Sequence, residues 1–249
     1  MIADFALGFG YALEGLRWLR RPGIRRFVVL PLAANVLLFA GAGWWLFASL
    51  DGLAGWVESL LPAWLAWLTW VLWPFAAAAF LAVAWFGFAL LANLVGSPFN
   101  GLLAERVAVL AGRAPAASLP LWREAIVAPL AELRKLAHFI LLAVPALLLF
   151  LVPGANVLAP LVWLAVSAWM LALEYGDYPM GNEGLRFVEQ RVRMRSRRAL
   201  ALGFGAGVLL LTVVPVLNFL SMPAAVVGAT LMWCSELATG SHSVAGGHC

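Results

Sequence analysis

The chain has 249 residues, of which 64% are hydrophobic and 11% are charged, and its mean hydropathy is +0.95. A soluble domain is roughly 45–50% apolar and about 25% charged, and a globule of this size has too little interior to bury so much apolar surface. The composition excludes a soluble enzyme, a disordered chain and a disulfide scaffold, and it indicates an integral membrane protein. The net charge of +4 comes from cations that flank apolar runs without any nucleic-acid-reading motif, so we expect no nucleic-acid partner.

The charges indicate how the chain is oriented in the membrane. Of the 16 cations 15 are arginine, and all lie in three blocks, at 17–26, 106–135 and 186–198. Short loops that are rich in Lys and Arg stay on the cytoplasmic side of a membrane. We therefore expect a multi-pass protein with the three blocks in the cytoplasm and the acidic loop 51–58 outside, flanked by an aromatic belt of tryptophans.

The predicted elements form one membrane domain over residues 1–249. Residues 1–21 form an amphipathic helix at the interface, and they lack the cationic start of a cleaved signal peptide. Runs 27–50 and 63–96 are long enough to cross a hydrocarbon core of about 30 Å. Residues 97–135 form a cytoplasmic helical connector, in which Ser97-Pro98 ends one helix and Asn100 caps the next.

The last two apolar runs, 136–173 and 199–235, are each interrupted near the middle. The first is broken at Pro153–Asn156 and the second from Pro215 to Pro223, so every remaining piece has 17 residues or fewer. A spanning helix needs about 17–25 residues. We expect two helical hairpins that partly penetrate the bilayer, and the alternative is four short spans. Between and after them lie a cytoplasmic basic segment, 174–198, and a flexible tail, 236–249.

The fold class that follows is an all-α integral membrane protein. It contains two long transmembrane helices, two broken helical hairpins and an N-terminal amphipathic helix. Turn backbone is not tolerated in lipid, so hairpin tips at membrane depth must be packed against protein or line a watery cavity. This requirement implies a protected interior or contacts between subunits.

A candidate binding site lies immediately before the first span. Pro22 is favoured as the first residue of a helix, so the backbone N–H groups of Gly23, Ile24 and Arg25 would be free at the positive end of the helix dipole. Such a terminus binds oxyanions, and the guanidinium groups of Arg25 and Arg26 can grip tetrahedral oxygens in pairs. The alternative is that these arginines only anchor the cytoplasmic face.

Other polar residues offer further candidates. Asn93, Asn100 and Glu105 would lie along a polar path, although a helix cap and interfacial charges explain them as well. Glu174 and Asp177 are three residues apart, but no cluster of His or Cys accompanies them, so neither a metal site nor an enzyme is expected.

Five arginines of the third cationic block form a predicted collar. This collar would concentrate anions at a cytoplasmic mouth or hold anionic lipid. Its members are Arg191, Arg193, Arg195, Arg197 and Arg198. The two cysteines, Cys234 and Cys249, have the spacing of neither a metal site nor a disulfide framework.

Four stretches of the chain resemble the CysZ family of bacterial sulfate permeases. They are PGIRRFVVLPLAANVLL (22–38), SPFNGLLAE (97–105), LAPLVWLAVSAWMLALEYGDYP (158–179) and VPVLNFLSMPAAVVGATLMW (214–233). The resemblance implies an oligomeric inner-membrane protein that passes sulfate into the cytoplasm for cysteine synthesis. It also implies that sulfate binds at Gly23, Ile24, Arg25 and Arg26, with Ile24 where the family often has Leu.

The leading hypothesis is therefore sulfate translocation through a homo-oligomer surrounded by membrane lipids. Secondary candidates for the anion pathway are Arg17, Asn35, Asn93, Asn100, Glu105 and Asn218. The chain lacks the GxxxxGK[ST] motif, so direct coupling to ATP is not expected. We also expect no cofactor. Two other functions remain open: a membrane scaffold or regulator that binds anionic lipid and partner proteins, and a lipid enzyme using Glu174 and Asp177.

Overall fold

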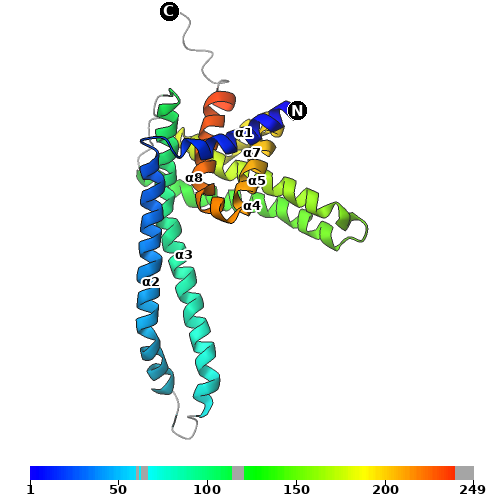
Figure 1. Cartoon of the computed structure of the whole chain (residues 1–249). Helices are drawn as coiled ribbons and strands as arrows, with labels where there is room; N and C mark the ends of the chain where they lie inside the picture. The colour runs from blue at the N-terminus through cyan, green and yellow to red at the C-terminus, as the bar shows by residue number, and fades with distance from the viewer. Residues whose placement is uncertain (60–61, 63–66, 114–120, 239–249) are drawn as a thin grey trace, which may run out of the picture. The chain divides into compact units, whose positions relative to one another are not determined.

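The computed structural model describes residues 1–59, 62, 67–113 and 121–238, and within these residues the chain is helical and has no strand. The helices, which apart from α6 are labelled in Figure 1, are α1 (Ile2–Trp18), α2 (Arg25–Ser59), α3 (Thr69–Leu110), α4 (Leu121–Leu148), α5 (Ala159–Asn182), α6 (Phe187–Ser196), α7 (Arg198–Val213) and α8 (Pro215–Met232). A π-helical turn at Trp233–Leu237 follows α8.

Among the described residues, five helical segments are long and apolar enough to cross a membrane. These segments are Arg25–Ser49, Trp70–Gly87, Leu133–Leu151, Ala159–Asn182 and Leu217–Leu237. The pair formed by α6 and α7 is bent by 103° and raises the number to six if it counts as one span. The prediction of an all-α, multi-pass membrane protein is therefore confirmed.

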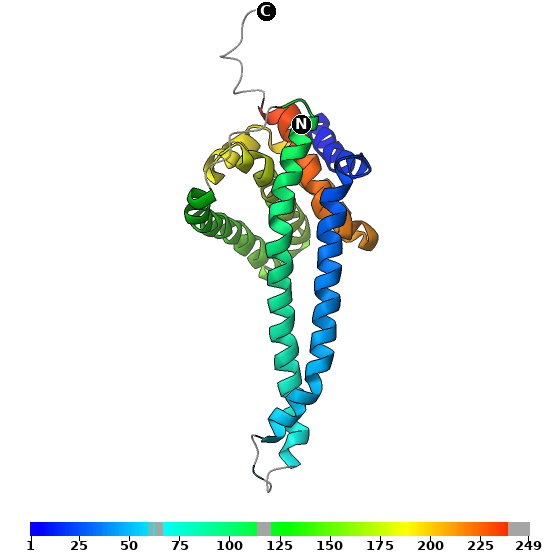
Figure 2. The same ribbon diagram turned by 90° about the vertical axis from the view of Figure 1, so that its left-hand side faces the viewer.

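Residues Val29–Phe99 form one of two compact units. In this unit α2 and α3 run side by side as a helical hairpin, in both Figure 1 and Figure 2, and the rings of Trp45 and Phe80 meet at 5.7 Å between their centroids. Almost no residue of its two spans is buried, and large side chains such as Leu37 and Phe47 are exposed. Helices that are apolar on all sides are suited to lipid.

The other unit contains Met1–Val28 and Asn100–Cys249. Here α1 packs against α7 and α8 (Figure 1), and the buried residues of α1 include the small residues Gly8, Ala12 and Gly15. A Cβ atom at Gly15 would lie 2.1 Å from the carbonyl oxygen of Ala224, and one at Gly203 would lie 2.0 Å from that of Phe5. Only glycine permits such close contact between helix backbones. The N-terminal helix is thus packed against the protein along one face.

The breaks in the apolar runs differ in extent. Between α4 and α5 the helix is interrupted around Pro153–Asn156, as predicted. Between α7 and α8 the prediction was too wide, because only Val214 is extended, Pro215 begins α8 and Pro223 lies inside it. Pro215 can begin α8 because proline suits the first position of a helix. Pro223 removes only one backbone hydrogen-bond donor from α8, and the other backbone groups remain paired because the helix continues.

The predicted helix end at Ser97-Pro98 was wrong. The helix α3 runs through these residues without interruption and ends at Leu110. A break there would leave several backbone groups without partners in apolar surroundings, whereas a continuous helix loses only the donor that proline lacks. Asn100 is consequently an interior residue of α3 and not a helix cap.

Candidate functional site

The candidate site begins with a tight turn between α1 and α2. The N–H of Arg21 donates to the carbonyl of Trp18 at 2.9 Å, and the N–H of Ile24 donates to the carbonyl of Arg21 at 3.2 Å. Gly23 has φ +90°, a left-handed conformation that favours glycine. Because this conformation cannot continue into a helix, α2 begins at Arg25, three residues later than Pro22.

The turn presents free backbone donors at the start of α2. Of the N–H groups predicted to be free, that of Ile24 is used within the turn, whereas those of Gly23 and Arg25 find no acceptor among the residues that the structure describes. The N–H of Arg26 is likewise free within the described chain. These groups lie at the positive end of the helix dipole.

Ile24 fixes the turn in place. Its side chain is fully buried, in one apolar cluster with Leu103 and Val107 of α3 and Val227 of α8. Burying an isoleucine side chain contributes roughly 1.5–3 kcal/mol, which holds the turn against the body of the protein. Ile24 therefore contributes position and a turn hydrogen bond, and it contributes no polar side chain.

Arg106 also belongs to this candidate site, although it was not predicted from the sequence. A Cβ atom at Gly23 would lie 3.7 Å from Nη2 and 4.0 Å from Nε of Arg106, so this guanidinium faces the turn. Its Nε is buried and has no hydrogen-bond partner in the described part of the chain. The signal was present in the helical spacing, since Leu103 and Val107 are buried one turn apart and Arg106 shares that side of α3.

Three guanidinium groups at this turn have no carboxylate partner in the part of the chain that the structure describes. Arg25 and Arg26 are exposed, and Arg26 lies over the ring of Phe27 at 4.9 Å from its centroid. No ion pair joins Arg25, Arg26 or Arg106 to an acidic residue that the structure describes. Free N–H groups and unpaired guanidinium groups together have the chemistry to hold an oxyanion.

The secondary candidates occupy several different places. Arg17 is an exposed residue in the last turn of α1, Glu105 is exposed on α3, and Asn218 is exposed in the first turn of α8. Asn35 belongs to the unit Val29–Phe99, and its buried Oδ1 has no partner within the described residues. Asn93 lies on α3, but its side chain falls outside the described part of the structure.

A second polar cluster joins α3, α4 and α5. Asn100 is buried and donates to the hydroxyl of Tyr178 at 3.4 Å. Lys135 is 7% exposed, and its Nζ lies 2.9 Å from a carboxylate oxygen of Glu174 and 3.1 Å from one of Asp177. The two carboxylates therefore share a lysine, and no group of three or more potential metal ligands occurs among the described residues.

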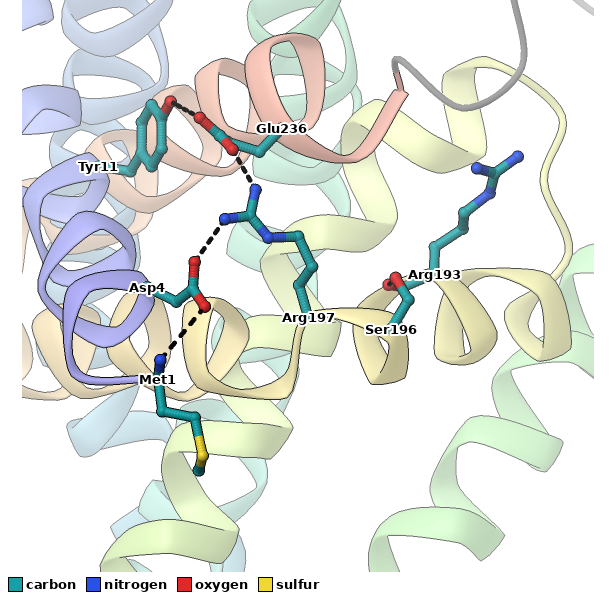
Figure 3. Close-up of polar contacts among 7 residues, drawn as sticks. All are labelled: Met1, Asp4, Tyr11, Arg193, Ser196, Arg197 and Glu236. Atoms are coloured by element: carbon teal, nitrogen blue, oxygen red, sulfur yellow. Dashed lines mark hydrogen bonds and ion pairs between the residues drawn. The ribbon is translucent and has the colours of Figure 1, made fainter.

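The arginines of the predicted collar differ in their contacts. Arg197 donates to Asp4 of α1 at 2.5 Å and also to Glu236, which accepts a hydrogen bond from the hydroxyl of Tyr11 (Figure 3). The hydrogen bond from Arg197 is the main cause that lowers the pKa of Asp4. Arg197 therefore ties α1 to the C-terminal π-helical turn, whereas Arg195 and Arg198 are exposed.

The chain matches a known protein family. A family model described as Sulfate transporter CysZ/Etoposide-induced protein 2.4 matches residues 11–223, which is most of the chain. The match includes the turn before α2, Arg106 and the cluster around Lys135. The sequence resemblance is confirmed at the level of this family: the chain belongs to the Sulfate transporter CysZ/Etoposide-induced protein 2.4 family of membrane proteins.

Proposed function

We propose that this protein conducts sulfate across the bacterial inner membrane into the cytoplasm, where it is assimilated into cysteine. The observation that carries the proposal is the turn before α2, where Arg25, Arg26 and Arg106 have no carboxylate partner among the described residues. The description of the matching family, which includes sulfate transporters, supports the choice of anion.

The chemistry of the turn suits a divalent oxyanion. The free N–H groups of Gly23, Arg25 and Arg26 supply directed donors, and the guanidinium groups supply charge and paired donors. Because a conducting site must bind its ion and also release it, strong binding in a closed pocket would slow transport. The exposure of Arg25 and Arg26 to solvent weakens their attraction and so favours release.

The proposal also covers the orientation of the protein in the membrane and its assembly. The turn before α2 lies on the cytoplasmic side if the arginine blocks follow the positive-inside rule. The protein acts as a transporter and not as an enzyme. It works as a homo-oligomer in contact with lipid, in accord with the exposed spans of α2 and α3.

Uptake of radiolabelled sulfate into liposomes that contain only this protein tests the proposal. The double variant Arg25→Ala/Arg26→Ala removes two charged donors, each of which contributes about 1.5–3 kcal/mol. Uptake at low sulfate should fall by about tenfold or more. The matched control, Arg20→Ala/Arg21→Ala, removes the same charge five residues earlier in the chain and should retain most of the uptake.

Two outcomes would contradict the proposal. Wild-type liposomes with no more uptake than empty vesicles would exclude transport and favour a scaffold that binds lipid and partner proteins. Equal loss of uptake in both double variants would show that the arginines act as general anchors of the cytoplasmic face. Multi-angle light scattering of the purified protein tests the oligomer, and a monomeric mass would exclude it.

A further inference from the structure

A second group of unpaired donors lies where α4 meets α6. Nη1 of Arg191 is 3.1 Å from Nδ1 of His138. A guanidinium has only donors, so Arg191 donates and Nδ1 of His138 accepts. An imidazole that accepts at Nδ1 carries its proton on Nε2. The contact therefore defines His138 as a neutral ring with an N–H at Nε2.

These donors are buried, and the described residues offer them no acceptor. His138 is 8% exposed, and its ring lies against Phe187, with 5.7 Å between the ring centroids. Neither Nε2 of His138 nor Nε of Arg191 has a hydrogen-bond partner in the described part of the chain. Buried N–H groups in proteins are almost always paired, so two unpaired donors on contacting residues indicate an acceptor from outside the chain.

The charge around these donors indicates the nature of that acceptor. Arg191 makes no ion pair with any acidic residue that the structure describes, and Arg195 lies one turn further along α6 and is exposed. A water molecule would satisfy a donor but would leave the charge of the guanidinium uncompensated. An anion with several oxygens supplies both the acceptors and the charge.

We propose that His138 and Arg191 form a second anion site, which binds the oxygens of a sulfate or phosphate group. His138 is five residues into the candidate span Leu133–Leu151, about 8 Å along the helix from its first residue. At that depth the group is either a free anion or the phosphate of an acidic lipid. The inference goes beyond the proposed transport, because it concerns equilibrium binding at residues outside the turn before α2.

Nitrogen NMR of histidine in the full chain tests the site. The protein is labelled with ¹⁵N-histidine in nanodiscs, and His242→Asn/His248→Asn leaves His138 as the only signal. In phosphatidylcholine, sulfate should shift the Nε2 signal saturably, whereas chloride at equal ionic strength should not. If the anion is a lipid phosphate, phosphatidylglycerol should produce the shift without sulfate. An Nε2 signal unchanged by both sulfate and phosphatidylglycerol would overturn the proposal.

Two variants of α6 separate the site from general charge effects. Arg191→Gln retains a donor for Nδ1 but removes the guanidinium, and it should weaken the response by about tenfold or more. Arg193→Gln removes the same charge two residues away and should leave the response unchanged. Equal effects of both variants would also overturn the proposal. The response should persist in Arg25→Ala/Arg26→Ala, so failure of the proposed transport and failure of this site are distinguishable.

Discussion

Substitution of Gly23 by alanine tests whether the backbone of the turn before α2 forms the anion site. Gly23 has φ +90°, and the left-handed region costs an L-amino acid roughly 1–2 kcal/mol. A Cβ atom there would lie 3.7 Å from Nη2 of Arg106, which is ordinary van der Waals contact. The substitution therefore adds backbone strain without a steric clash. The variant relieves that strain by turning the free N–H groups away from the site.

The strain determines the size of the expected effect. If the binding conformation lies about 1–2 kcal/mol above a relaxed turn, about one molecule in six to one in thirty holds it at 25 °C. The apparent Kd for sulfate should rise by the inverse of that fraction, which is about sixfold to thirtyfold. Equilibrium binding of radiolabelled sulfate to the purified protein measures this change directly.

Gly154→Ala is the matched control. Gly154 also has a left-handed conformation, with φ +84°, and no atom of the described residues lies within 4 Å of the Cβ that alanine would add. Both variants should lower the thermal midpoint to a similar extent, while only Gly23→Ala should weaken sulfate binding. Wild-type affinity in Gly23→Ala, or an equal loss of affinity in Gly154→Ala, would refute the role of the turn backbone.

Three further predictions concern the packing and charges of the fold. Gly15→Ala should lower the stability by about 1–3 kcal/mol in thermal unfolding, because its Cβ would lie 2.1 Å from a carbonyl oxygen of α8. Gly10→Ala on the same helix meets no atom of the described residues within 4 Å and should raise the stability by up to about 1 kcal/mol. The lowered pKa of Asp4 means that its stabilising contact with Arg197 is complete above about pH 5 and is lost as the pH falls from about 4 through the folded pKa. The difference in thermal midpoint between wild type and Asp4→Asn should follow that course, and a difference that is constant down to about pH 2 would contradict it. Lys135→Met should lower the free energy of unfolding by up to about 3 kcal/mol. This value is the lower end for a buried ion pair, because the two carboxylate partners of Lys135 are partly exposed. Neutralising both carboxylates should restore part of the lost stability.

The membrane spans could be predicted because their signal is local. A run of apolar residues has the same transfer free energy whatever lies around it, so Arg25–Ser49 and Trp70–Gly87 follow from composition and length. The break at Pro153–Asn156 could also be predicted, because its signal likewise lies in neighbouring residues of the sequence. The prediction failed at Pro98, because the cost of one missing donor is small beside the cost of a broken helix in apolar surroundings.

The candidate site was only partly predictable. Gly23, Ile24, Arg25 and Arg26 are neighbours in the chain, and their residue types were sufficient to suggest an anion site. Arg106 is more than seventy positions away, so its approach to Gly23 depends on how α3 packs against the turn. The spacing of buried residues on α3 was the sequence signal for Arg106. This signal can be interpreted once it is known which segment packs against that face of α3.

The sequence by itself determined that the chain is a helical membrane protein whose cations, almost all arginine, flank apolar runs. Only the tertiary structure decided which arginines are already neutralised by the protein. Arg197 is paired with Asp4, 193 residues earlier in the chain, whereas Arg106 and Arg191 have buried donors without partners among the described residues. The physical reason is that an ion pair depends on distance in space, which helix packing determines, while hydropathy accumulates along the chain.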